Sequence, residues 1–303
     1  MSKSATATNA GSTAPWATIK QPAQKVAVAV LIVGILLGLW QYRETLLTLM
    51  AITPQSVAFG TVALAIFTVI VWLLYRRSSL AQPTKRADWW LLFAFTWGAM
   101  GTMVFVDWLQ DAVRGIAVGF GWEGAEMALA GAYPEELGKA VGVALILIAG
   151  AKYFNRVWDG FIVGIATGLG FELFETMTYG ATGGLTDPNS DIGGALSTLG
   201  LRFVLGFGLH AFWTGIIGYA LGRALLDPRL STAQRWLLAV GACFASFIFH
   251  FGWNYQAESV IINIGKMAVI YIGMIAITVW LWRRCAKVAK AQAAAANPAP
   301  RVV

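Results

Sequence analysis

Residues 134–151 read PEELGKAVGVALILIAGA and place Glu135, Glu136 and Lys139 at the head of a long apolar run. An ionisable group at the edge of hydrocarbon costs about 3 kcal/mol on insertion scales, so such groups are expected to be functional or paired with one another. The partners of these three side chains are therefore the first thing to look for along the chain.

The composition is that of a polytopic membrane protein. Of the 303 residues, 58% are hydrophobic and only 12% are charged, which lies outside the range of an ordinary soluble domain. The formal charge of +7 comes from Lys and Arg clustered between apolar runs, as in loops that orient a membrane protein. We therefore expect a lipid bilayer around the chain and no nucleic acid as a partner.

A helix needs about 20 mostly apolar residues to cross a bilayer. Eight runs approach or reach that length, and they predict an all-α polytopic bundle of about eight transmembrane helices. These runs are residues 26–42, 55–75, 88–110, 134–151, 158–180, 199–222, 234–255 and 258–282.

The remaining segments complete the expected organisation. Residues 1–25 and 286–303 are predicted to be disordered tails. Residues 111–133 are amphipathic and fit an interfacial or re-entrant segment better than a span. Residues 26–110 then hold three peripheral helices, and residues 134–285 form the functional core.

The basic residues predict the orientation of the bundle. With both termini cytoplasmic, 17 of the 22 Lys and Arg fall on the inner side and two in outer loops, and three lie within or at the mouth of spans. Because basic residues accumulate in cytoplasmic loops, this distribution favours eight spans with both ends inside.

Glycines recur four residues apart in three of the runs, at 138 and 142, at 160, 164 and 168, and at 218 and 222. Small residues at this spacing let helix backbones approach closely, so these three spans are expected to form the tight centre of the bundle. The glycine-rich segment 181–198 is expected to be an outer loop, either a flexible gate or, by preference, a plain linker.

Both histidines of the chain, His210 and His250, fall inside predicted spans. In HAFWT and in HFGWN the histidine is followed by Trp at i+3 and by Thr214 or Asn254 at i+4, so each set shares one helix face. A wall formed by Trp213 or Trp253 would hold an imidazole in a dry site. Trp253 equally suits an aromatic belt at the membrane interface.

A second acidic pair, Glu172 and Glu175, lies in GLGFELFETMTYG, residues 168–180. The two carboxylates share a face, and with no basic residue in the same run they need partners from other helices: Lys139, a histidine or a metal. Pro134 is expected in the first turn of its helix, which would put Glu135 and Glu136 at the positive end of the helix dipole.

The predicted orientation gathers these groups at one face. The two acidic pairs, His250 and Asn254 all map to the outer half of the membrane. His210 lies about eleven residues down its run, roughly 16 Å from that face at 1.5 Å per residue.

Glutamates and imidazoles that converge inside a membrane suggest hydrolysis. In one version Glu135 or Glu136 is the general base toward a water, while His210, His250 and Asn254 stabilise the oxyanion. In a second version His210, His250 and Glu175 coordinate zinc, and a glutamate of the 135/136 pair is the base. Ligands on three different helices leave no spacing signature, so both versions stay open.

Four motifs in order resemble those of the PrsW family of intramembrane proteases, which is distantly similar to the CAAX-processing membrane proteases. They are EELGK, GFIVGxxxGxGFxLFE followed by a tyrosine, HAFWTGIIGYALG and HxxWN, within residues 134–254. The family pattern marks Glu135, Glu136, Lys139, Glu175, His210 and His250, with Trp253 and Asn254 in the last motif.

The resemblance implies a bacterial cell-membrane peptidase. Its substrate would be a membrane-anchored protein cut near the extracytoplasmic face, as in signalling through anti-sigma factors. The sequence departs from the family pattern at Glu172, where a small or apolar residue is usual, and at Thr176, where an asparagine is usual. Two alternatives remain: a proton- or cation-coupled transporter with these carboxylates as relays, and a catalytically silent scaffold for membrane helices.

Overall fold

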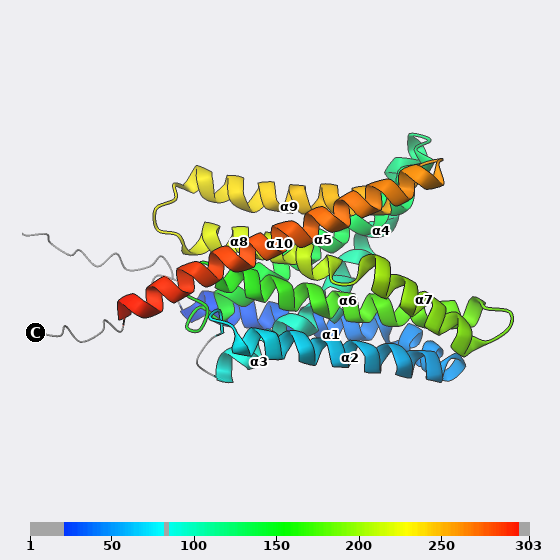
Figure 1. Ribbon diagram of the computed structural model, residues 1–303, viewed down its shortest axis with the longest axis horizontal. Coiled ribbons are helices and arrows are strands. Elements are labelled where there is room, and N and C mark those ends of the chain that lie inside the picture. The colour runs from blue at the N-terminus through cyan, green and yellow to red at the C-terminus, as the bar shows by residue number, and fades with distance from the viewer. Residues whose placement is uncertain (1–20, 82–84, 297–303) are drawn as a thin grey trace, which may run out of the picture.

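The computed structural model describes residues 21–81 and 85–296, and within this part the chain is helical and has no strands. The elements run in one elongated bundle (Figure 1). They are α1 (Gln21–Ile52), α2 (Pro54–Arg77), α3 (Lys85–Thr96), the π-helical turn η2 (Trp97–Gly101), α4 (Thr102–Gly119), the 3-10 turn η3 (Glu123–Ala125), α5 (Glu126–Ala149), α6 (Asp159–Thr186), α7 (Asp191–Gly206), α8 (Leu209–Leu226), α9 (Thr232–Asn254) and α10 (Val260–Ala296).

Seven helical segments of the described chain are long and apolar enough to cross a membrane: 21–52, 54–77, 86–119, 159–186, 191–226, 232–254 and 260–295. The eighth predicted span, 134–151, lies mostly in α5, which carries four charged residues, Glu126, Glu135, Glu136 and Lys139. The predicted all-α membrane bundle is thus confirmed.

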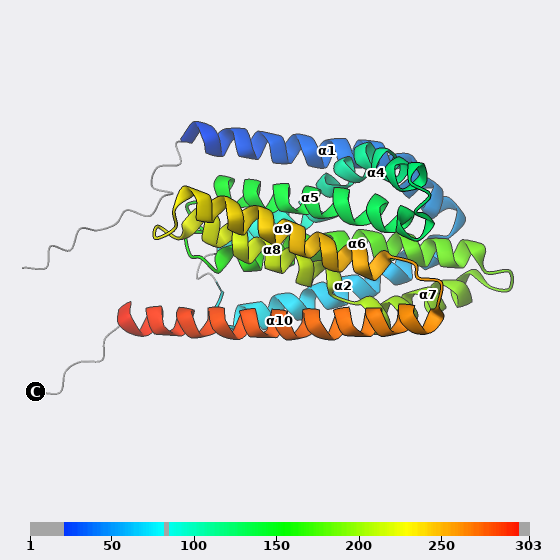
Figure 2. The ribbon, with the colours of Figure 1, turned by 90° about the horizontal axis from the view of Figure 1, so that it is seen from above.

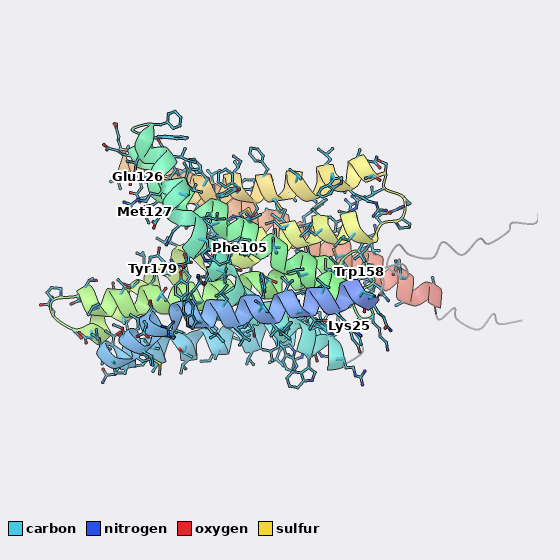
Figure 3. All side chains as sticks on the ribbon, turned by 180° about the vertical axis from the view of Figure 1, so that it is seen from behind. Lys25, Phe105, Glu126, Met127, Trp158 and Tyr179 are labelled. Carbon is cyan, nitrogen blue, oxygen red and sulfur yellow. The ribbon has the colours of Figure 1, made fainter. Side chains whose placement is uncertain are left out.

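The helices run alternately up and down the bundle. Figure 2 shows that α1 begins at the end of the bundle where α10 finishes. In Figure 3, Lys25 and Trp158 lie toward that end, while Glu126, the first residue of α5, lies at the other. Because the described chain begins and finishes at the same end of the bundle, it passes along the bundle an even number of times, and α5 is one of these passes.

Several predicted boundaries are wrong. Residues 21–25 begin α1 and residues 286–296 continue α10, so neither stretch is part of a disordered tail; residues 1–20 and 297–303 lie outside the described part. The segment 111–133 is shared between the end of α4, a turn, η3 and the first residues of α5.

The glycine-rich segment 181–198 is mostly helical rather than a loop, because α6 runs on to Thr186 and α7 begins at Asp191. The Ser190 side chain caps α7 by accepting from the N–H of Gly193. The predicted span 199–222 is broken where α7 ends at Gly206 and α8 begins at Leu209. Gly208 makes the break possible with a φ of 84°, a conformation that L side chains rarely adopt.

Helices α6 and α8 approach each other closely along the predicted glycine series. A Cβ at Gly160, Gly164 or Gly168 would lie only 2.1–2.2 Å from a carbonyl oxygen of α8, at Gly218, Thr214 and His210 respectively. Side chains are therefore excluded along this seam, and the backbones of α6 and α8 are fixed against each other.

The glycines of α5 face a different neighbour from the one expected. A Cβ at Gly142 would lie 2.0 Å from the Trp97 ring, and the Trp97 indole donates to the carbonyl of Gly138 at 3.0 Å. Trp97 is the first residue of the π-helical turn η2. This turn therefore supports α5 next to Lys139, and α5 packs on α3–α4 through its small residues.

Candidate active site

The first acidic pair forms a buried ionic cluster within α5. Glu135, Glu136 and Lys139 are 7%, 2% and 0% exposed. The Lys139 ammonium donates to Glu135 Oε2 at 3.1 Å and to Glu136 Oε1 at 2.9 Å, as the i+4 and i+3 spacings predicted. It also lies 3.9 Å from the centroid of the Phe171 ring. The carboxylates and the ammonium thus compensate one another's charge.

The expected position of Pro134 is wrong. Helix α5 begins at Glu126, so Pro134 lies inside it, and the two glutamates are more than two turns from its positive end. The helix dipole effect falls off within the first turn, so Lys139 and not the dipole balances these charges.

Helices α8 and α9 bring both histidines to this cluster. His210 Nδ1 lies 2.8 Å from Lys139 Nζ and 3.8 Å from Glu135 Oε2. His250 Nδ1 lies 3.0 Å from Glu136 Oε1, and its Nε2 lies 3.8 Å from Glu135 Oε2. His210 is the second residue of α8, directly after the break at Gly208, and it lies beside the other groups of the cluster.

Asn254 completes the α9 face: its Nδ2 lies 3.1 Å from His250 Nε2. The Trp213 ring stacks on the His250 ring, with centroids 4.2 Å apart and planes at 15°. The tryptophan of the HAFWT motif therefore packs against the histidine of the HFGWN motif. Trp253 lies farther out, on the wall of an adjoining cavity and 6.2 Å from the Tyr271 ring.

Two residues that sequence reasoning did not assign also reach the acids. Ser246, one turn before His250, donates to Glu136 Oε2 at 2.7 Å. The Arg202 guanidinium on α7 pairs with Glu175. The available signals were the i−4 spacing of Ser246 from His250 and the presence of Arg202 in an apolar run.

The second acidic pair converges on a single residue of α8. Glu175 Oε2 lies 2.8 Å from His210 Nε2. The two oxygens of Glu172 accept the backbone N–H groups of Gly208 and His210, each at 3.1 Å. These acids thus find partners in the ring and backbone of His210, in the N–H of Gly208 and in Arg202.

The hydrogen-bond network assigns the histidine tautomers. A carboxylate only accepts, so His210 donates from Nε2 to Glu175 and His250 donates from Nδ1 to Glu136. The opposite nitrogens, Nδ1 of His210 and Nε2 of His250, then carry lone pairs, and both lie 3.8 Å from Glu135 Oε2. Neutral imidazoles whose other N–H is held by a carboxylate are the usual state of metal-binding histidines.

Glu135, Glu136, His210 and His250 form a group whose ligand atoms all lie within 4.8 Å of one another. Imidazole nitrogen and carboxylate oxygen are donors that suit zinc, so these residues fit the ion. Glu175, expected as the third ligand, is not in this group. The Lys139 ammonium contacts Glu135, Glu136 and His210, so it shares acceptors with any metal bound there.

A cavity of about 180 Å³ adjoins the cluster. Its wall includes Glu175, His210, His250 and Asn254 from the cluster, with Arg202, Leu201 and Met267 on the side of α7 and α10. A larger apolar cavity of about 380 Å³ lies among α2, α3, α6 and α10 and includes none of the cluster residues. The smaller cavity is therefore the one that gives access to the candidate site.

A membrane helix bundle with buried glutamates and histidines able to hold a metal belongs to the class of intramembrane metalloproteases. A family model described as PrsW family intramembrane metalloprotease matches residues 86–281, well over half of the chain. The chain therefore belongs to the PrsW family. No match was found among curated proteins or among solved structures.

The match confirms the resemblance carried by the four motifs and makes the chain a multi-pass membrane hydrolase. It gives no support to the transporter or scaffold alternatives. Between the two versions of the chemistry, the family description favours the one that uses a metal.

Proposed function

We propose that this chain is an endopeptidase that cuts a peptide bond of a membrane-anchored protein at the cluster formed by α5, α8 and α9. The observation that carries the proposal is the buried group of Glu135, Glu136, His210 and His250 beside a cavity. All four lie within 134–285, the segment that the sequence predicts as the functional core.

His210 through Nδ1 and His250 through Nε2 would hold the metal, while the Glu136 carboxylate would fix the His250 ring by accepting from its Nδ1. Glu136 suits a fixed position, because Lys139, His250 and Ser246 all hydrogen-bond to it. A zinc ion bound there supplies a water of lowered pKa and polarises the scissile carbonyl.

We assign the general-base role to Glu135. Its Oε2 faces the lone-pair nitrogens of both histidines and is held only by Lys139 among the hydrogen bonds of the described chain. A carboxylate with so few partners is free to accept the proton of an attacking water. Asn254, beside His250, is placed to donate to the oxyanion of the tetrahedral intermediate.

The surroundings of the cavity support a substrate that arrives from the lipid. Leu201 of α7 lines the cavity and is 60% exposed, and Leu205 beside it is 44% exposed. Met267 of α10 lines the opposite side. A segment anchored in the bilayer reaches the cluster between these two helices without passing through water, which favours membrane proteins over soluble ones.

The face of cleavage follows from the charge distribution. The basic loops 76–87, 152–156 and 223–235 predict a cytoplasmic end. His250 lies near the opposite end of α9, only four residues before that helix finishes. We therefore propose cleavage in the extracytoplasmic half of a bacterial cell membrane, with a single-span protein of the anti-sigma-factor kind as the substrate class.

The test uses purified full-length protein in liposomes with a single-span model substrate and zinc. We expect Glu135→Gln to lower kcat by about 10²–10⁴-fold while the protein still binds zinc, because only the proton acceptor is lost. Glu136→Gln is expected to weaken zinc binding by about 10–100-fold as well as lower activity, because it loosens the His250 ring. Glu258→Gln, at an exposed glutamate, is the matched control. Wild-type cleavage by Glu135→Gln would overturn the assignment of the base.

A further inference from the structure

The Glu172 carboxylate is not used by the chemistry proposed above, yet it is 2% exposed and fully engaged. Its two oxygens accept the N–H groups of Gly208 and His210 at 3.1 Å each. Within the described residues both hydrogen bonds of this carboxylate go to backbone N–H groups at the start of α8, which points to a structural role there.

The first N–H groups of a helix have no partner inside it. Helix α8 starts abruptly, because Gly208 turns the chain with a φ of 84° directly before Leu209. Gly208 offers no side chain to cap the helix. Glu172 takes the place of the missing cap from a neighbouring helix and satisfies two of these N–H groups.

The position of Glu172 continues the glycine seam. Gly160, Gly164 and Gly168 follow one another at intervals of four on α6, and Glu172 is the next residue in that series. The seam brings Gly168 against the carbonyl of His210, where a Cβ would lie 2.2 Å away. One turn later there is room for a side chain, and the carboxylate reaches the N–H of the same histidine.

Glu175, three residues further on α6, holds the ring of His210 through Nε2 at 2.8 Å. Helix α6 therefore hydrogen-bonds to both the backbone and the side chain of His210. We propose that Glu172 is a positioning residue, which fixes the start of α8 so that His210 Nδ1 is aimed at Glu135. This inference rests on the proposed function, in which His210 Nδ1 is a metal donor.

The break between α7 and α8 is also stabilised through a backbone carbonyl. The Tyr271 hydroxyl of α10 donates to the carbonyl of Phe207 at 2.9 Å. Tyr271 thus holds the end of α7, while Glu172 holds the start of α8. Because Glu172, unlike Tyr271, bonds directly to the backbone of His210, its loss is expected to misplace the imidazole.

The test compares Glu172→Leu with Ser231→Ala. Ser231 forms the capping box of α9 with Gln234, at the opposite end of that helix from His250, so it controls for the loss of a cap away from the site. We expect Glu172→Leu to raise the zinc dissociation constant and lower kcat, each at least tenfold, with KM changed less than twofold. We expect Ser231→Ala to lower only the thermal unfolding temperature.

A second readout does not depend on zinc. Hydrogen exchange of the amides in residues 207–211 is expected to become at least tenfold faster in Glu172→Leu. Unchanged exchange, or zinc affinity and kcat equal to those of Ser231→Ala, overturns the positioning role. If Glu172→Leu does not fold, Glu172→Gln, which keeps one acceptor oxygen, is expected to raise the zinc dissociation constant two- to fivefold, and an unchanged value overturns the role.

Wild-type protein that neither binds zinc nor cleaves substrate contradicts the proposed function instead. In that case the amide exchange of residues 207–211 still decides whether Glu172 holds the start of α8.

Discussion

The acidic pair of α5 and the acidic pair of α6 are both buried, yet their oxygens face different partners. Glu135 and Glu136 are adjacent in sequence and share one ammonium, that of Lys139. Glu172 and Glu175 are three residues apart, and both reach across to His210 on α8. The first pair concentrates charge where a reaction needs it. The carboxylates of the second pair hold the imidazole of His210 in position.

The comparison is tested most strongly by removing the ammonium of the first pair. Lys139→Met leaves Glu135 and Glu136 without their charge partner, and loss of one member of a buried ion pair typically costs 3–5 kcal/mol. We expect a large fall in thermal unfolding temperature in chelator, partly reversed by zinc, whose charge replaces the ammonium. Lys266→Met, at a lysine whose ammonium donates to the Trp253 carbonyl, is the control. A stability equal to wild type would contradict the proposed compensation.

Removal of the metal is expected to have the next largest effect. Zinc held at 100 times its dissociation constant stabilises a folded state by about 2.7 kcal/mol. Chelation should therefore lower the unfolding temperature and abolish cleavage, and added zinc should restore both. In the double variant His210→Ala, His250→Ala the unfolding temperature should no longer respond to zinc. A response that survives in this variant would place the metal elsewhere.

The role of the second pair is tested by Glu175→Gln. The change weakens the bond to His210 Nε2 and removes the charge opposite Arg202. Loss of a carboxylate that orients a metal-binding histidine typically costs 10–100-fold in metal affinity. Competition with a zinc chelator measures the change, and Arg202→Met, which leaves the contact between Glu175 and His210 in place, should have a smaller effect. Equal losses would indicate that the ion pair, and not the imidazole, is what matters.

Asp227 lies in the loop between α8 and α9. Its ion pairs can be compared with those of the two acidic pairs inside the bundle. Hydrogen bonds from Arg229, and then from Arg223, hold the pKa of Asp227 well below its usual range. The stabilisation is therefore complete above the unfolded pKa of about 3.9 and is lost as pH falls through the lower folded value.

Because Arg229 is 83% exposed, this contribution should stay below about 1 kcal/mol. Thermal unfolding between pH 7 and pH 3 checks it: the difference between wild type and Asp227→Asn should be small at pH 7 and become smaller as pH falls below about 3.9, where the unfolded carboxyl begins to protonate. A constant difference over that range would exclude this carboxylate as the cause.

Patterns within one helix were predictable from the sequence. The spacing of Lys139 from Glu135 and Glu136 gave the ion pairs that form. The shared face of His250 and Asn254 likewise became a direct contact. Both follow from helical periodicity, which fixes neighbours three and four residues apart whatever the rest of the fold does.

Features that depend on contacts between helices were not predictable. Nothing in the apolar run 199–222 marks Gly208 as a break rather than one more membrane glycine. The partner of Glu172 is backbone, which has no sequence signature. Pro134 was misread because proline is common at helix starts, whereas here packing carries α5 through it. The segment 181–198 was misread because glycine was given more weight than the packing of α6 and α7.

The π-helical turn Trp97–Gly101 has a consequence for comparisons of chain length. Such a turn closes its hydrogen bonds over five residues rather than four, so it holds one residue more than the α-helix around it. Five π-helical residues turn the chain about as far as four α-helical ones, so deleting one residue there would restore an α-helix and leave the faces of α3 and α4 nearly unchanged. An alignment of relatives that lack this extra residue should therefore open a one-residue gap at this turn and nowhere else in the third pass.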